Sequence, residues 1–510
     1  MPDNVSADNK RQSFEEFRKG ILSDYNEIKQ TLLDRYADFL NGEWHEYESL
    51  NAEKRDRKPK PRTAPSVDTN RPEKPEAPAQ PVKPIKPVRP EKPAQPEKPV
   101  APAQPVKPIK PVRPEKPAQP EKPVAPAQPV KPAQPEKPAP SDNNQDDGDS
   151  FSFYSIPMVM PQVEFNISDR LYSNNDYASH WRQLDKADVA SRLLPYFKGA
   201  AKELNLNDYL TFQLMRHYVD SRFASAHESS RISTLHYLLA NAGFDVRLAT
   251  TGDGVPLLLI PFDQTIYGRT FLKLDGKKYY IFPPENYDVT KIAGQRILTC
   301  RLPDNVNLGK DMNLTLQPLN IPFKGKQFDI NYGPLHLTGE VNENLMPILY
   351  RYPQMPVSGY ATSELQPQLR RSIAEQISTQ LAGMSQAEAV EALLHFMQQA
   401  FEYSIDEDTH GFEKPYFIEE TLYYPSNDCE DRAIFYTYFL WNALNTGSQL
   451  ISFPGHESAS VTLSEPVDGA SYNYRGTTYF ISDPTYIGAN TGMVMPAYKN
   501  ETPTIDFTYE

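Results

Sequence analysis

The chain has 510 residues, a formal net charge of −13 and only two cysteines, so its composition excludes a disulfide-rich fold. The acidic excess is concentrated between Phe401 and Glu510, where seventeen acidic residues stand against four basic ones. Such a field repels phosphate backbones, which argues against a nucleic-acid partner. No apolar run is long enough to predict a transmembrane segment, and no signal peptide is visible.

Residues 1–57 carry the pattern of one long amphipathic helix. A capping box begins at Ser13, and apolar side chains then recur at steps of three and four from Phe14 to Phe39. The steps repeat as an eleven-residue unit, which favours a straight or slightly right-handed assembly over a heptad coiled coil. The apolar stripe needs a partner, so we expect either self-association through this helix or docking onto the folded body.

Residues 58–150 are predicted to form a Pro-rich linker of low complexity. The stretch Ala77–Val100 recurs identically as Ala101–Val124, and a truncated third copy begins at Ala125. Repeats of this kind adopt polyproline II or remain disordered and act as semi-rigid spacers. We therefore expect this linker to contribute nothing to a core.

Two folded regions are predicted between the linker and the C-terminal domain. Within 151–300, helices are expected at 206–221 and 229–242, followed by four strands at 245–249, 255–260, 270–274 and 278–282. Alternating apolar residues from Leu314 to Tyr352 predict a β-rich connecting region over 301–365.

The C-terminal domain, 366–510, carries the candidate nucleophile. Two helices are expected first, at 365–380 and, behind a capping box at Ser385, at 385–401. Cys429 then precedes an apolar run with helical spacing, and Ser426 or Asn427 could cap that helix. A cysteine at a helix start is favoured as thiolate by the helix dipole, although its acidic neighbours raise the thiol pKa. The helix of 385–401 should pack beside it.

A base and a carboxylate follow downstream of the cysteine. His456 comes after a strand and a tight turn at Pro454-Gly455, and Asp483 ends a later strand. A histidine can take the thiol proton, and a carboxylate can fix the tautomer of the ring. The preceding stretch 410–413 could line a substrate cleft, although a plain loop is the simpler interpretation. The histidines show no metal-ligand spacing, so we predict no metal site and no cofactor, although Asp406-Glu407-Asp408 could hold calcium weakly. Cys300 is predicted to be a small buried residue.

Three motifs in this order resemble the transglutaminase-like cysteine enzyme superfamily, which includes transglutaminases, bacterial peptidases and peptide N-glycanases. The motifs are Asp428-Cys429-Glu430-Asp431-Arg432, Gly455-His456 and Asp483-Pro484-Thr485. The resemblance implies an α+β fold with a papain-like core, in which helices pack on an antiparallel sheet. It also implies a catalytic triad of Cys429, His456 and Asp483.

Residues 151–300 show the same order of elements, so we interpret them as a degenerate copy of the C-terminal domain. Setting Arg231 against Arg432 puts Glu228 at the position of Cys429 and Asp253 near His456. Such a copy would lack nucleophile, base and orienting carboxylate. Chance similarity between two α+β segments is the alternative.

The predicted function is acyl transfer from a protein or peptide amide through a thioester on Cys429. Bacterial members of the superfamily are often hydrolases, so the resemblance favours a cysteine peptidase or amidase. A crosslinking transglutaminase is one alternative, and a non-catalytic binding or scaffold protein is another. The spacer suggests a periplasmic or cell-surface location, whereas a true N-terminus at Met1 would suggest the cytoplasm.

Overall fold

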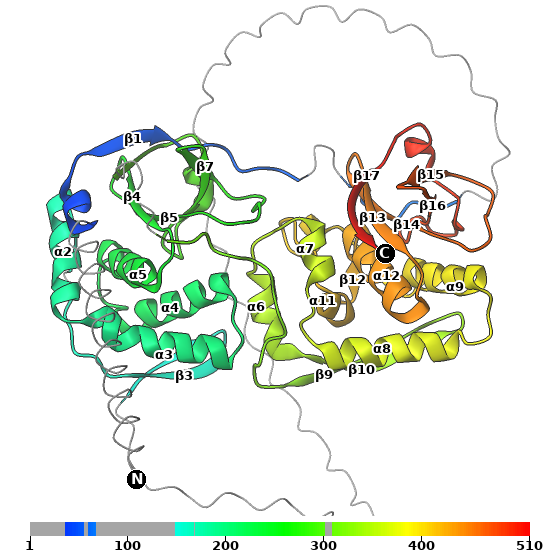
Figure 1. Ribbon diagram of the computed structural model, residues 1–510, viewed down its shortest axis with the longest axis horizontal. Helices are drawn as coiled ribbons and strands as arrows, with labels where there is room; N and C mark the ends of the chain where they lie inside the picture. Colours follow the sequence, from blue (N-terminus) through cyan, green and yellow to red (C-terminus); the bar gives the residue numbers. More distant parts are fainter. Residues whose placement is uncertain (1–35, 56–59, 68–147, 168, 301–308) are drawn as a thin grey trace, which may run out of the picture. The chain divides into compact units, whose positions relative to one another are not determined.

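A computed structural model of the chain describes residues 36–55, 60–67, 148–167, 169–300 and 309–510 (Figure 1). The described residues fall within one compact unit, 1–68 together with 147–510. They form an α+β fold in which the large sheets are antiparallel, as the sequence predicted. Most of the predicted N-terminal helix (1–35) and of the predicted linker (68–147) lies outside the described residues.

The first region, 148–300, begins with a hairpin of β2 (Gly148–Phe153) and β3 (Ile156–Pro161). Helices and then strands follow, and they include the two helices and four strands predicted there. The helices are α2 (Asn174–Lys186), α3 (Val189–Glu203), α4 (Asp208–Arg222) and α5 (Glu228–Ala242). The strands are β4 (Arg247–Thr251), β5 (Pro256–Ile260), β6 (Phe271–Leu274), β7 (Lys277–Phe282) and β8 (Arg296–Cys300).

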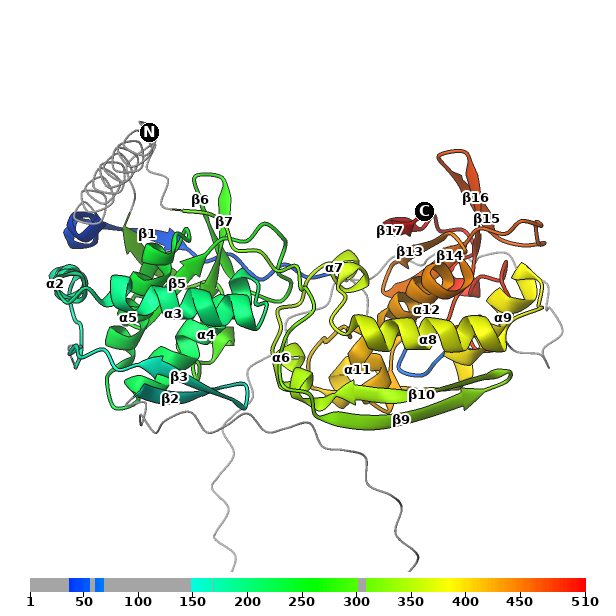
Figure 2. The ribbon, with the colours of Figure 1, turned by 60° about the horizontal axis from the view of Figure 1, so that its bottom comes forward.

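Helix α5 is the centre of this region. It packs against β4 and β5 on one side and against α2, α3 and α4 on the other (Figure 2). Ten of its side chains, from Ser229 to Leu239, are buried, because the helix is covered by the sheet on one side and by other helices on the other. The sheet order is β1-β8-β4-β5-β7-β6.

The edge strand β1 (Trp44–Glu48) comes from the residues assigned to the N-terminal helix, so the boundary at 57 differs from the prediction. β1 pairs antiparallel with β8, Trp44 opposite Cys300. Before it, Tyr36, Ala37 and Leu40 are buried, and the Tyr36 hydroxyl lies 2.7 Å from Nε2 of His236. The described end of the helical pattern therefore packs on the folded body.

The connecting region contains one hairpin, β9 (Gly325–Tyr332) and β10 (Leu335–Asn342), and two short helices, α6 (Met346–Tyr350) and α7 (Val357–Thr362). The strands predicted around Leu314 and at Leu349 are wrong. Residues 313–324 join no sheet, and Leu349 lies in α6, whose start is favoured by a proline in its first turn. Alternation alone could not separate a buried single-turn helix from a strand.

The C-terminal domain places one helix, α12, between a sheet and two other helices (Figure 2). α12 contacts β13 and β14 on one side and α8 and α9 on the other, and hairpin β9–β10 packs against α8. The sheet order is β15-β16-β14-β13-β17. The helices are α8 (Pro367–Gln380), α9 (Gln386–Gln399), α10 (Asp406–Thr409), α11 (Ile418–Tyr423) and α12 (Cys429–Leu444). The strands are β11 (Glu402–Tyr403), β12 (Ser426–Asn427), β13 (Ser448–Phe453), β14 (His456–Val461), β15 (Ser471–Tyr474), β16 (Thr477–Ile481) and β17 (Thr504–Tyr509).

The predicted helix pair around the cysteine is confirmed. Ser385 caps α9 through the predicted capping box, in which the Glu388 carboxylate accepts the Ser385 N–H at 2.8 Å. α9 packs beside α12, as expected. Among the described residues, no helix is long and apolar enough to cross a membrane.

The two sheets repeat one strand order. Reading from the last strand, the first sheet runs β8-β4-β5-β7-β6 and the second runs β17-β13-β14-β16-β15. Every neighbouring pair in both is antiparallel, and each sheet is covered by the helix that directly precedes it in sequence, α5 or α12. The first sheet adds β1 at its edge.

Residues 60–67, assigned to the linker from the sequence, contact the C-terminal domain instead. Ser66 forms a parallel bridge with Ile487, flanked by hydrogen bonds of 2.8 and 3.0 Å that join the Ile487 backbone to Pro65 and Val67. The Tyr403 hydroxyl donates to the Pro61 carbonyl at 2.9 Å. Proline-rich composition conceals this contact because its partners are remote in sequence.

Candidate active site

Cys429 is the first residue of α12, and the cap of this helix differs from the prediction. The N-cap is Asp428, whereas the predicted caps Ser426 and Asn427 form β12, which pairs with β11. Asp431 fixes the helix start, because its Oδ2 accepts the Asp428 N–H at 3.2 Å. The same carboxyl group accepts the N–H of Tyr416 at 2.7 Å through Oδ1. The cysteine therefore stands at a rigid helix N-terminus.

His456 and Asp483 are brought together by the sheet. A tight turn with Gly455 at φ +73° joins β13 to β14, and His456 is the first residue of β14. β16 pairs with β14 and ends two residues before Asp483, which leaves His456 Nε2 2.8 Å from Asp483 Oδ2. The Tyr498 ring stacks parallel to the imidazole at 5.5 Å. The ring is thus held on two sides.

The other imidazole nitrogen, Nδ1 of His456, is buried and has no hydrogen-bond partner among the described residues. Close by, the Cys429 sulfur receives the backbone N–H of Glu457, the residue after the histidine. A direct hydrogen bond between Cys429 and His456 is not among the described contacts. The structure therefore joins His456 to Asp483, and it sets the sulfur of Cys429 near the backbone N–H of the residue that follows His456.

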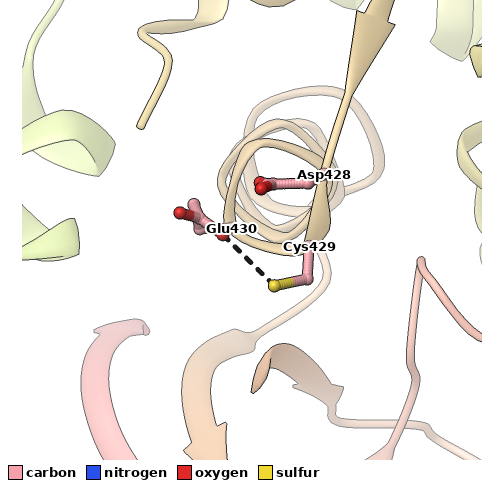
Figure 3. A group of neighbouring side chains, drawn as sticks. All are labelled: Asp428, Cys429 and Glu430. Atoms are coloured by element: carbon pink, nitrogen blue, oxygen red, sulfur yellow. Dashed lines mark hydrogen bonds between the residues drawn. The ribbon is translucent and has the colours of Figure 1, made fainter. Parts of the chain in front are cut away.

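The thiol proton of Cys429 is directed elsewhere, toward Glu430. Figure 3 shows the sulfur and the Glu430 carboxyl group on one side of the first helical turn, with Sγ donating to Oε2 at 3.2 Å. Complete burial, followed by the charges of Glu430 and Asp428, raises the pKa of the thiol well above its usual value. Of the two opposing influences expected from the sequence, the acidic neighbours prevail over the helix dipole, and burial, which the sequence did not predict, is the largest cause of the raised pKa. The sulfur is a protonated thiol here.

Lys60, which the sequence placed in the spacer, is buried beside the sulfur. Its Nζ pairs with Glu430 and lies 2.6 Å from Glu413, 3.2 Å from Asp428 and 3.9 Å from Asp406. Its side chain is 6% exposed. We call Asp406, Glu413, Asp428 and Glu430 the acidic cluster. Three of its members, Asp406, Glu413 and Glu430, place carboxylate oxygens within 4.8 Å of one another.

The charges of the acidic cluster are strongly perturbed. Burial alone would lower the pKa of Lys60, but Asp428 and Glu430 raise it well above its usual value. Burial alone would raise the pKa of Glu430, but Lys60 and Arg55 hold it well below the usual range. Burial, then the neighbouring carboxylates, raises the pKa of Asp406 to about 9 and that of Glu413 to about 8. The cluster therefore carries protons at neutral pH. It would gain negative charge if Asp406 and Glu413 lost these protons.

Arg55 completes the cover over the cysteine. Its Nη2 lies 2.8 Å from Glu457 Oε2, and its Nη1 lies 3.7 Å from Glu430 Oε1. Arg55 and Lys60 thus anchor the chain around residues 55 and 60 to the carboxylates beside Cys429. The Cys429 side chain is 0% exposed. The other cysteine, Cys300, is buried and free, as predicted, and burial raises its thiol pKa to about 11.

Sequence reasoning missed Lys60 and Tyr403, and it did not predict that the four members of the acidic cluster lie together. Glu413 lies in the stretch 410–413, for which a plain loop was the simpler interpretation, and Lys60 stands among prolines. The available signal was the unbalanced negative charge of the C-terminal domain, since several buried carboxylates require a cation. In comparisons with known proteins, no protein-family model and no curated sequence matches this chain.

Proposed function

We propose that the chain is a thiol-dependent acyl-transfer enzyme that hydrolyses protein or peptide amides, a cysteine peptidase or amidase. Cys429 is the nucleophile, His456 the base and Asp483 the residue that orients the base. The observation that supports this most is the buried His456–Asp483 pair beside a cysteine at a helix start, with the second imidazole nitrogen left unpartnered. Cysteine nucleophiles are activated by this kind of pairing.

The proposed reaction uses these groups in two steps. His456 Nδ1 takes the thiol proton while the sulfur attacks the carbonyl carbon, and the same proton then passes to the departing amine as the C–N bond breaks. Asp483 stabilises the imidazolium ion that forms between these events. Water then attacks the thioester, giving a carboxylic acid and the free thiol. The Cys429 backbone N–H at the helix start is the proposed donor to the oxyanion.

We also propose that the C-terminal domain has a transglutaminase-like, papain-like core and that residues 151–300 are its degenerate copy. The repeated strand order supports the duplication, as does the position of Glu228, which begins α5 as Cys429 begins α12. In the same proposal, transamidation by an amine is the alternative fate of the thioester.

A binding protein without catalysis is the second candidate. The complete burial of Cys429 and its protonated thiol favour it, because neither suits a nucleophile that must meet a substrate. Displacement of Lys60 and Arg55 would be needed before the enzyme could act.

The test is the trapping of an acyl-enzyme. The purified chain is incubated with a peptide library, quenched in acid and examined by mass spectrometry for a thioester on Cys429. We expect an adduct and cleaved peptides with the unmodified chain and with Cys300→Ala, and neither with Cys429→Ala. Cleavage by Cys429→Ala at the original rate would refute the proposal.

A further inference from the structure

Among the described residues, Lys60 is in contact with all four members of the acidic cluster, and it brings a primary ammonium group, whereas Arg55 reaches only Glu430 of these four. Lys60 has three N–H donors, and carboxylates of Glu413, Asp428 and Glu430 surround them. Oδ1 of Asp428 is buried and has no hydrogen-bond partner among the described residues, so an acceptor remains for a further donor. A compact ammonium suits such a set better than the planar fork of an arginine.

The backbone next to Lys60 is held as well. Tyr403 donates its hydroxyl to the carbonyl of Pro61, the residue that follows the lysine. Tyr403 pairs with Asn427 in the short parallel ladder that leads directly into Cys429. Farther along, the segment adds its bridge to Ile487, four residues after Asp483. Residues 60–67 thus lie along the site as a peptide that bends at Arg62 and Thr63, bound by both side chain and main chain.

We infer that the acidic cluster is a subsite for the ammonium side chain of a lysine-containing peptide substrate, and that Lys60 and Pro61 occupy it in the manner of such a substrate. Tyr403 is the residue that positions the carbonyl next to this lysine. The inference rests on the proposed function, because it assigns the substrate class of the same site.

The charge of the bound amine decides whether it is recognised as an ammonium group or attacks the thioester as a nucleophile. Carboxylates raise the pKa of Lys60, so an amine in this position keeps its proton and cannot attack a thioester. The subsite therefore recognises a charged side chain and does not deliver an acceptor amine. This assignment agrees with hydrolysis and separates it from crosslinking through the same lysine.

The experiment measures peptide binding in the absence of turnover. The full-length chain carrying Lys60→Ala and Cys429→Ala is titrated with a labelled peptide of residues 58–67 and with the same peptide bearing norleucine for Lys60. We expect the lysine peptide to bind at least about tenfold more tightly, the equivalent of about 1.4 kcal/mol. Glu430→Gln added to this chain should remove most of that preference, because Glu430 is the cluster member whose pKa lies well below the usual range and which pairs with Lys60, whereas Glu465→Gln at the exposed surface should not. Equal binding of the two peptides, or binding of neither, overturns the inference.

Two further measurements separate this inference from the proposed function. With Lys60 retained, Cys429→Ala should bind the lysine peptide more weakly than the double variant does, because the tethered lysine competes; equal affinity contradicts the inference. Cleavage of lysine and norleucine peptides is then compared in Lys60→Ala. Selective binding without cleavage refutes the proposed function alone, and cleavage with no preference for lysine refutes the subsite alone.

Discussion

The first and the second sheet share one strand order but bury different side chains in equivalent strands. Strand β5 reads Pro-Leu-Leu-Leu-Ile and is buried throughout, as expected for a strand that serves packing. Strand β14 is buried to the same degree but reads His-Glu-Ser-Ala-Ser-Val. Burying polar groups costs free energy unless they are hydrogen-bonded, so a fold gains nothing from this substitution alone. The contrast distinguishes β14, which carries residues of the proposed active site, from its counterpart β5.

The pairing of residues between neighbouring strands allows the two sheets to be aligned residue by residue. The last paired residues before the turns are Thr250–Pro256 in the first sheet and Phe453–His456 in the second, and a hydrogen bond from the Thr251 N–H to the Val255 carbonyl extends the first hairpin further. Aligning the two sheets on the paired residues sets Pro256 at the position of His456. In the next strands, Ile260 pairs with Tyr280 and Ser460 pairs with Ile481. In the first sheet, Phe282 therefore takes the position that Asp483 has in the second. This alignment differs from the sequence-based match, which set Asp253 near His456 and stays a prediction. Asp253 lies in a longer turn, and such an insertion cannot be seen without the pairing.

Among the variants that test the difference between the two sheets, we expect the largest loss of activity from a substitution of Asp483. Asp483→Asn keeps the shape of the side chain but favours the wrong tautomer of His456, which costs as much as ~10⁴-fold in serine triads. A thiol ionises more readily, so we expect a loss of roughly tenfold to a thousandfold in kcat with little change in KM. Steady-state turnover of the best library peptide measures it.

Phe282→Leu is the matched control for this loss, since Phe282 holds the equivalent position in the first sheet. It should lower the melting temperature, because a buried side chain shrinks, and leave kcat unchanged. His456→Ala gives the floor of activity. Wild-type turnover in Asp483→Asn, beside an inactive His456→Ala, would make Asp483 a turn residue only.

A smaller effect is expected from removing residues 60–67. Because Cys429 is fully buried, access limits its alkylation more than the thiolate fraction does, and the deletion should raise the rate on the order of tenfold. The opposing influence is electrostatic, since loss of Lys60 removes a charge that lowers the thiol pKa. The measurement is iodoacetamide labelling at neutral pH, with adducts located by mass spectrometry.

Deletion of 101–108, an equal length of the repeated linker, is the control and should leave the labelling rate unchanged. Cys300, in the first region, provides an internal reference that neither deletion should alter. An unchanged rate at Cys429 after removal of 60–67 would mean that other residues cover the sulfur.

The smallest effect concerns Asp406 and pH. Its folded pKa of about 9 lies above the ordinary value of about 3.9, so folding binds a proton. The stability associated with that proton is present at low pH and is lost as pH rises toward 9. Asp406→Asn should reduce the fall in melting temperature between pH 6 and pH 9 by roughly 2–4 °C.

Asparagine retains an oxygen for the Lys414 N–H, which Asp406 accepts at 2.7 Å, so the change removes the titrating proton and little else. Asp275→Asn, at a carboxylate 64% exposed in the first region, is the control and should leave the pH profile as it is. Identical profiles for wild type and Asp406→Asn would show that Asp406 is not the buried acid that titrates.

Local patterns predicted much of this fold and the candidate triad. The spacing of apolar residues predicted α5, α9 and α12, and the strands on either side of Gly455 placed His456 correctly. The cover over the site could not be predicted, because Lys60 is joined to its carboxylates by contacts hundreds of residues apart. The strand predicted at Leu349 was wrong for another reason, since a single helical turn is too short to show a period in its apolar residues.

The bridge between Ser66 and Ile487 is formed within one chain, so the fraction of molecules in which Cys429 is covered does not depend on dilution. A separate inhibitory peptide leaves its site as the solution is diluted, but residues 60–67 belong to the chain that they cover. Their effective concentration at Cys429 is a property of the molecule and does not depend on how much protein is present. The covered fraction is therefore the same at nanomolar and micromolar protein. Only a competing ligand, a cut in the chain or a change in protonation can alter it.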